Sequence, residues 1–94
     1  MRLNPHELNT IRATLHACDP TGRIRLFGSR ADDTRRGGDI DLYFEPSRTI
    51  DPKTALLLQY QLTHRCDTQV DLLIRNPEQP LQPIHKIAEA GVEL

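Results

Sequence analysis

The chain has 94 residues, which is the size of one small domain. Its 12 Lys and Arg residues against 13 Asp and Glu residues give a net charge of −1, which argues against a protein that coats nucleic acid with a basic surface. The sequence contains no apolar run of the roughly 18–20 residues that span a membrane, no signal-peptide block and only two cysteines, too few for a disulfide framework. We therefore expect a single cytoplasmic domain over residues 1–94, without direct contact to membranes or nucleic acid.

Apolar and polar residues alternate in patterns that predict three helices and three strands. In chain order they are a helix over Pro5–Ala17, a strand over Arg23–Phe27, a strand over Asp39–Phe44, a helix over Pro52–Arg65, a strand over Gln69–Ile74 and a short helix over Pro83–Ala90. Asn4 and Glu7 form a capping-box pattern at the start of the first helix. This order predicts an α/β (α+β) domain, with a small mixed sheet of about three strands and the helices packed on one face.

Three aspartates occupy strand positions that face away from the apolar side of the predicted sheet. Asp39 and Asp41 are two residues apart, so their side chains project from the same face. Asp71 lies in the third strand, opposite to Val70, Leu72 and Ile74. If these strands are neighbours, the three carboxylates converge and repel one another unless cations lie between them. Carboxylate oxygens suit Mg²⁺ or Mn²⁺, whereas an isolated Asp-x-Asp pair is more often simply solvated.

A second candidate site feature is Gly28-Ser29, which ends the first predicted strand. Glycine lets the backbone approach a ligand closely, and a helical turn after it would offer free N–H groups to an anion. Arg30, Arg35 and Arg36 follow in the same polar stretch. A lone Gly-Ser pair is more often simply a turn, but here Gly28 and Ser29 are candidates for binding an anion, and Arg30, with the other two arginines, could contact a triphosphate.

For several other residues, a structural role is favoured over a functional one. Tyr43 shares a face with the aspartates, and sheet-edge packing is the favoured explanation over stacking on a base. His85 is expected on a helix surface. The run Leu56–Leu58 is wider than one core face needs and can mark an interface. The pairs His16/Cys18 and His64/Cys66 match no established zinc spacing, so a zinc site is the weaker interpretation.

The segment from Gly28 to Leu42, GSRADDTRRGGDIDL, resembles the signature of the DNA polymerase beta-like nucleotidyltransferase superfamily. It is most similar to the minimal nucleotidyltransferases, the smallest members. The resemblance extends from about Ile24 to Ile74, and the segment Ile87–Val92 is also similar. The usual family spacing is ten residues between Gly-Ser and the Asp pair; this chain has nine, and Gly37-Gly38 can absorb the difference.

The resemblance implies a palm-like core and a role for each matched residue. Gly28 and Ser29 would hold the triphosphate, and the two aspartates of the pair, Asp39 and Asp41, would bind two Mg²⁺ ions, with Mn²⁺ as a substitute. Asp71 would be the third carboxylate, which binds the catalytic metal and helps to activate the acceptor hydroxyl. The reaction would be attack of that hydroxyl on the α-phosphate of ATP with release of pyrophosphate.

Minimal nucleotidyltransferases often pair with a helical toxin of the HEPN family, and the resemblance extends the expectation to this partner. The chain would then be an antitoxin that transfers AMP to a tyrosine of the toxin. Two alternatives remain at this stage. One is an antitoxin that neutralises its partner by contact alone, and the other is a transferase for a small molecule. The thin hydrophobic fraction of 37% is consistent with a domain that is stabilised in a homo- or hetero-oligomer.

Overall fold

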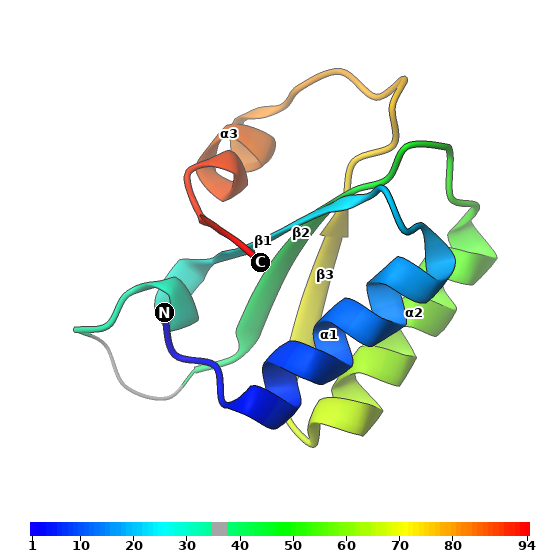
Figure 1. Cartoon of the computed structure of the whole chain (residues 1–94). Coiled ribbons are helices and arrows are strands. Elements are labelled where there is room, and N and C mark those ends of the chain that lie inside the picture. The colour runs from blue at the N-terminus through cyan, green and yellow to red at the C-terminus, as the bar shows by residue number, and fades with distance from the viewer. Residues whose placement is uncertain (35–37) are drawn as a thin grey trace.

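The computed structural model describes residues 1–34 and 38–94. The described elements are α1 (Pro5–Cys18), β1 (Arg23–Phe27), the 3-10 turn η1 (Gly28–Ala31), β2 (Ile40–Glu45), α2 (Pro52–Cys66), β3 (Val70–Ile74), α3 (Pro83–Glu89) and β4 (Val92–Glu93). The strands form one sheet in the order β3-β2-β1-β4 (Figure 1). No helix in the described ranges is long and apolar enough to cross a membrane.

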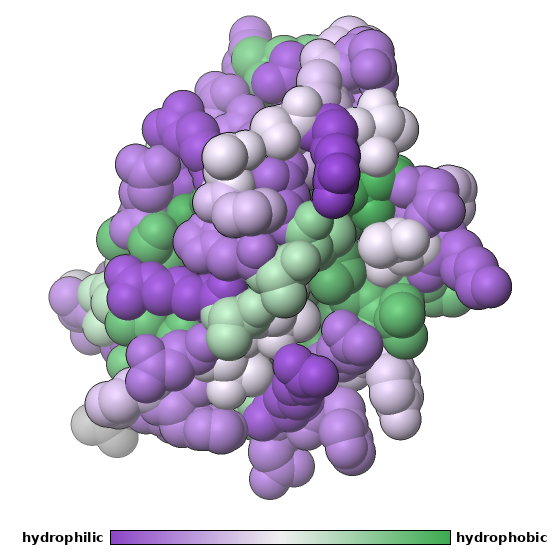
Figure 2. Space-filling model, turned by 45° about the vertical axis from the view of Figure 1, so that its right-hand side comes forward, coloured by the Kyte–Doolittle hydropathy of each residue, from purple (hydrophilic) through white to green (hydrophobic). Residues whose placement is uncertain are grey.

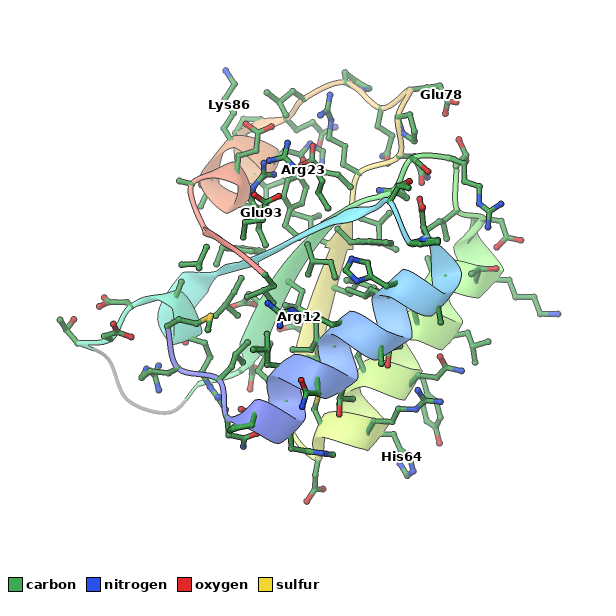
Figure 3. All side chains as sticks on the ribbon, in the orientation of Figure 1. Arg12, Arg23, His64, Glu78, Lys86 and Glu93 are labelled. Carbon is green, nitrogen blue, oxygen red and sulfur yellow. The ribbon has the colours of Figure 1, made fainter. Side chains whose placement is uncertain are left out.

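The sheet is mixed, as the sequence predicts. β2 pairs with β1 in antiparallel orientation and with β3 in parallel orientation. β4 adds a short antiparallel edge strand beside β1, where Arg23 and Glu93 point toward each other and form an ion pair (Figure 3). The parallel pairing of β2 and β3 is the feature that positions the site, because α2 connects the two strands and returns the chain to the same end of the sheet.

Two long helices cover one face of the sheet (Figure 1). The capping box of Asn4 and Glu7 is present at the start of α1, and Asp51 caps α2 through the N–H of Thr54. The helices run antiparallel, so His6 near the start of α1 contacts the carbonyl of Arg65 at the end of α2. Between helices and sheet lies one apolar core, whose fully buried members include Ile11, Leu15, Leu26, Leu42, Phe44 and Leu62.

The third helix lies against the other face of the sheet, which differs from the expectation that all helices share one face. Tyr43 points away from Leu42 and Phe44, and its ring is fully buried and stacks on His85 of α3, with 5.9 Å between ring centroids. Tyr43 therefore belongs to a central strand covered by a helix. Its interpretation as sheet-edge packing was wrong, and so was the expectation that His85 is a surface residue.

The remaining differences from the sequence prediction are small. β4 was not expected, because two residues are too short to show a period, and the sheet has four strands instead of about three. β2 begins at Ile40, one residue after the predicted start, and β3 begins at Val70. The helices end within one residue of their expected ends. The α/β class and the mixed sheet are confirmed.

Candidate active site

The parallel pairing of β2 and β3 brings the predicted aspartates to one end of the sheet. Asp41 and Asp71 are direct partners across the two strands, so their side chains leave the same face of neighbouring strands. Asp39 lies immediately before β2, two residues from Asp41. Asp39 and Asp71 are exposed, whereas Asp41 is partly buried. The strand adjacency on which the sequence interpretation depended is thus present.

The ionisation of Asp41 is perturbed by its surroundings. Burial raises the pKa of Asp41 above its ordinary value of 3.8, and the negative charges of Asp71 and Asp39 raise it further. A negative charge at Asp41 is therefore less favourable in the folded protein than in water. A cation between the carboxylates would remove this penalty.

The donor set of this cluster fits a hard divalent cation, because it consists of carboxylate oxygens alone. Among the described residues, however, no group of three or more His, Cys, Asp or Glu side chains forms a ready metal cage. Asp71 is held by a hydrogen bond of 3.0 Å from the Gln69 amide to one of its oxygens.

Gly28 places the turn after β1 directly against the carboxylate of Asp41. Its φ of +71° lies in the left-handed region that favours glycine, and a Cβ atom at this position would collide with the carboxylate of Asp41. β1 pairs Phe27 with Asp41, so the end of β1 and the start of β2 are adjacent. The expected helical turn follows as η1, which contains Ser29. The Gly-Ser turn and the aspartates therefore lie together as one candidate site.

Gly38 closes the loop that begins at Gly28. Its φ is +88°, and a Cβ atom there would collide with the hydroxyl of Ser29. The backbone just before Asp39 consequently packs on the Gly-Ser turn. This close approach makes a contact between the two halves of the sequence motif that spacing alone does not reveal.

Arg30 has a different environment from the one expected of a nucleotide ligand. Its guanidinium donates hydrogen bonds to the carbonyls of Gly38 (3.0 Å) and Arg2 (2.9 Å) and pairs with Glu7 at 3.3 Å. Direct binding of a nucleotide by Arg30 stays a prediction that would require these contacts to be exchanged. Arg35 and Arg36 lie outside the described residues.

The zinc alternative finds no support in the arrangement of the helices. His16 and Cys18 lie at the end of α1, and His64 and Cys66 lie at the end of α2. Because the two helices are antiparallel, these pairs occupy opposite ends of the helical layer.

Sequence reasoning missed one residue that links the site to a neighbouring surface. Gln69 bonds Asp71, and it also lines a groove of about 640 Å³ between α2 and the edge of β3. The other groove residues are Lys53, Leu56, Leu57, Gln59, Tyr60 and Thr63. Gln69 is two residues before Asp71 and thus on the same face of the strand, a period-two signal that was available in the sequence.

The groove is apolar and exposed, unlike most of the surface. Apolar side chains reach the surface in patches between polar ones (Figure 2). In the groove the exposed fractions are 73% for Leu56, 54% for Leu57 and 66% for Tyr60. The edge of β3 beside it is already satisfied, because Gln59 and Thr63 bond the backbone of Val70 and Leu72. An occupant of this groove would have to make side-chain contacts, since those backbone groups already have partners.

Comparison with known proteins identifies the family. The sequence model of the family described as Polymerase beta, Nucleotidyltransferase matches residues 9–94, which includes both halves of the site and all four strands. No curated protein gave a significant match. The described fold, with three helices and a four-stranded mixed sheet, is consistent with the core of this family. The chain therefore belongs to the polymerase beta nucleotidyltransferase family.

Proposed function

We propose that the chain transfers AMP from ATP to a hydroxyl group, expected to be a tyrosine, of a protein partner. The partner we propose is a helical toxin of the HEPN family, so that the chain acts as its antitoxin. The observation that carries the proposal is the meeting of Asp41, Asp71 and Gly28 at one end of the sheet. Family membership supports nucleotidyl transfer in general, and the protein acceptor is the part that the experiment below tests.

The proposed chemistry assigns a task to each residue. The backbone of the Gly28–Ser29 turn would hold the phosphates, because its close approach leaves no side chain in the way. Asp39, Asp41 and Asp71 would hold divalent cations, for which we propose Mg²⁺, with Mn²⁺ as a substitute. When bound, such ions neutralise the charge that develops on the attacking and leaving oxygens.

The exposed Asp71 is the proposed acceptor-side carboxylate. It would orient the acceptor hydroxyl and take its proton, while the hydroxyl oxygen bonds to the α-phosphorus and the bond to the β-phosphate oxygen breaks. Pyrophosphate is then the leaving group. Asp71 suits this task better than Asp41, because Asp71 is the more exposed of the paired residues and already accepts a hydrogen bond from Gln69.

The groove along α2 supports a protein acceptor. Its exposed leucines and tyrosine are the kind of surface that binds another protein. Because Gln69 lines the groove and also bonds Asp71, a protein docked there would lie next to the proposed acceptor carboxylate. The groove is broad and apolar, so it is less suited to enclosing a small acceptor.

The direct test is transfer of label from α-³²P-ATP to the protein encoded next to this chain, in the presence of Mg²⁺. We expect label on that protein with the wild-type chain and none with Asp39→Ala/Asp41→Ala. A matched control is Glu78→Ala/Glu89→Ala, which removes two exposed carboxylates outside the site. This control should label the partner as well as the wild type does.

The same groove also favours the second candidate, an antitoxin that neutralises by contact. In that case the two proteins form a stable complex, the partner receives no label, and the double aspartate variant neutralises as well as the wild type. Label on a small hydroxyl compound with none on the protein would instead identify a small-molecule transferase. Each result contradicts the proposed protein transfer.

A further inference from the structure

We propose that Glu7 and Arg30 are positioning residues that hold the Gly28–Ser29 turn and the Gly38–Asp39 backbone in the relative arrangement that a nucleotide and its metal require. The inference rests on the proposed function for its consequence, but the restraint on these two segments is itself a property of the free protein. Glu7 lies on α1, far from the sequence motif, and no sequence pattern connects it with the site.

Arg30 connects the turn after β1 with the backbone that precedes β2. It follows Ser29 in η1, and its Nε donates to the carbonyl of Gly38, the residue immediately before Asp39. One side chain therefore connects the start of the motif to the residue that introduces the Asp pair. The packing of Gly38 on the Ser29 hydroxyl also requires these two segments to lie close together.

Glu7 fixes the orientation of the Arg30 guanidinium. Its carboxylate is 3.3 Å from a terminal nitrogen of Arg30, and the side chains are only 8% and 15% exposed, respectively. The same oxygen accepts the N–H of Asn4 in the capping box, at 3.0 Å. Since Glu7 is also held by the capping box of α1, its ion pair connects Arg30 and the turn after β1 to the start of this helix.

The N-terminal segment adds a second restraint on the same turn. Arg2 donates from its guanidinium to the carbonyls of Ser29 (2.8 Å) and Asp32 (3.3 Å). The backbone N–H of Arg2 bonds the carbonyl of Arg30 at 2.8 Å, and Arg30 returns a bond to the carbonyl of Arg2. Together with the ion pair to Glu7, these reciprocal contacts explain why the Arg30 guanidinium is directed toward other protein groups and not toward the aspartates of the site.

The restraint matters because the site must bring a phosphate-binding turn and a carboxylate pair together before the ligand arrives. If the Gly28–Ser29 turn and the Gly38–Asp39 backbone were not held together, each binding event would have to order them, and this cost would weaken binding. Loss of a residue that orients a ligating group without binding the ligand itself typically lowers metal affinity or activity about 10–100-fold. We expect Glu7 and Arg30 to act at the lower end of that range.

Conservative variants separate this role from direct nucleotide binding. Arg30→Lys keeps the positive charge but cannot reach Gly38, Arg2 and Glu7 together, because lysine lacks the planar fork. Glu7→Gln keeps the capping box, for which glutamine is also suitable, but removes the charge of the pair. Arg12→Lys makes the same exchange as Arg30→Lys, on the exposed side of α1 (Figure 3), and is the matched control.

The first readout needs no ligand. We expect the heteronuclear ¹H–¹⁵N NOE of Gly38 and Asp39 to fall in Arg30→Lys and in Glu7→Gln, while the dispersion of the remaining amide signals and the NOE values of β1 stay as in the wild type. In Arg12→Lys the NOE values of Gly38 and Asp39 should not change. Unchanged values in Arg30→Lys and Glu7→Gln would overturn the positioning role, whether or not the protein binds a nucleotide.

The second readout is calorimetric binding of α,β-methylene-ATP with Mg²⁺. We expect each single variant to bind about 10-fold more weakly, and the double variant to lose about the same factor rather than the product, because both residues act through one contact. An unchanged affinity in Glu7→Gln would overturn the contribution of Glu7 to binding, and a tighter affinity would indicate instead that a released Arg30 binds phosphate directly. If the wild type does not bind the analogue, the proposed function fails, and the NOE values still decide the positioning role.

Discussion

The carboxylate of Asp41 lies against Gly28 and is influenced by the negative charges of Asp71 and Asp39. Its pKa is raised by burial first and by Asp71 and Asp39 second. The folded protein therefore binds a proton at Asp41 more readily than the unfolded chain does, and ionisation of this residue opposes folding at neutral pH. A site that stores unfavourable charge in the absence of a cation is a common cost of function.

Replacement of Asp41 should separate its cost to stability from its role in the proposed reaction. We expect Asp41→Asn to raise the free energy of unfolding at pH 7 while it abolishes nucleotidyl transfer. The gain should shrink as the pH falls through the raised pKa toward 3.8, the ordinary value, because the wild-type carboxyl then becomes protonated as well. Urea denaturation across this pH range measures the effect.

Magnesium provides the control for that experiment. Mg²⁺ should stabilise the wild type and have little effect on Asp41→Asn, because an ion that binds only the folded state adds to its stability. A variant that is less stable than the wild type at neutral pH would show that Asp41 is not under electrostatic strain.

Gly28 is the second residue that the site requires. Gly28→Ala should lower the free energy of unfolding by about 1–2 kcal/mol for the positive φ alone, with a further loss from the collision with Asp41. Nucleotide affinity should fall as well, because the turn can no longer lie against the carboxylates. In an Asp41→Ala background the collision is absent, so the cost of Gly28→Ala should decrease to the φ contribution. Equal costs in both backgrounds would contradict the close approach.

At the scale of elements, α3 is a short helix that one buried side chain anchors to the sheet. It has only seven residues, and it is attached to the outer face of the sheet through a buried His85. The ring of His85 stacks on Tyr43, and its Nδ1 accepts the N–H of Gln82 at the start of the helix. One side chain therefore both caps the helix and anchors it to β2, the strand that carries Asp41.

Loss of this anchor should destabilise the domain. We expect His85→Ala to cost about 1–3 kcal/mol, since it removes a buried ring, a helix cap and an aromatic contact. His64→Ala is a matched control: His64 stacks on Tyr60 at the same centroid separation of 5.9 Å, but on the surface. Its cost should stay within about 0.5 kcal/mol. Thermal or urea unfolding compares the two variants, and equal losses would mean that α3 contributes little.

At the scale of the whole molecule, the site and the groove lie on neighbouring surfaces and meet at Gln69. The groove residues of α2 do not contribute to the core, although their sequence first indicates a wide helix face. Leu58 and Leu62 are buried, whereas Leu56 and Leu57 are exposed. Binding of a partner and binding of a nucleotide should therefore be separable by substitution.

A charge in the groove should affect the partner only. We expect Leu57→Glu to leave the unfolding free energy within about 0.5 kcal/mol of the wild type and to leave nucleotide affinity intact, but to abolish labelling of the partner protein. Ile87→Glu makes the same kind of exchange on α3, where Ile87 is 64% exposed and outside the groove. The control should retain labelling. Equal labelling by both variants would place the acceptor elsewhere.

Much of this molecule follows from the sequence by itself. Period-two and helical spacing determine the three helices and the three longer strands, because each has one face that must be buried. The same patterns place Asp39, Asp41 and Asp71 opposite the apolar faces. The Gly28–Leu42 segment indicates the nucleotidyltransferase family, since it combines a turn and a carboxylate pair at a defined spacing.

The tertiary structure decided what periodicity cannot express. A two-residue strand such as β4 has no period, and no local pattern tells which face of the sheet α3 covers, so Tyr43 and His85 were misplaced. The environment of Arg30 depends on Glu7, which is 23 residues away in the sequence. Local sequence determines which face of an element is apolar, but only the packing of distant segments determines which charged groups meet. For this reason the sequence could name the aspartates, and only the fold could show that Asp41 and Asp71 are direct partners.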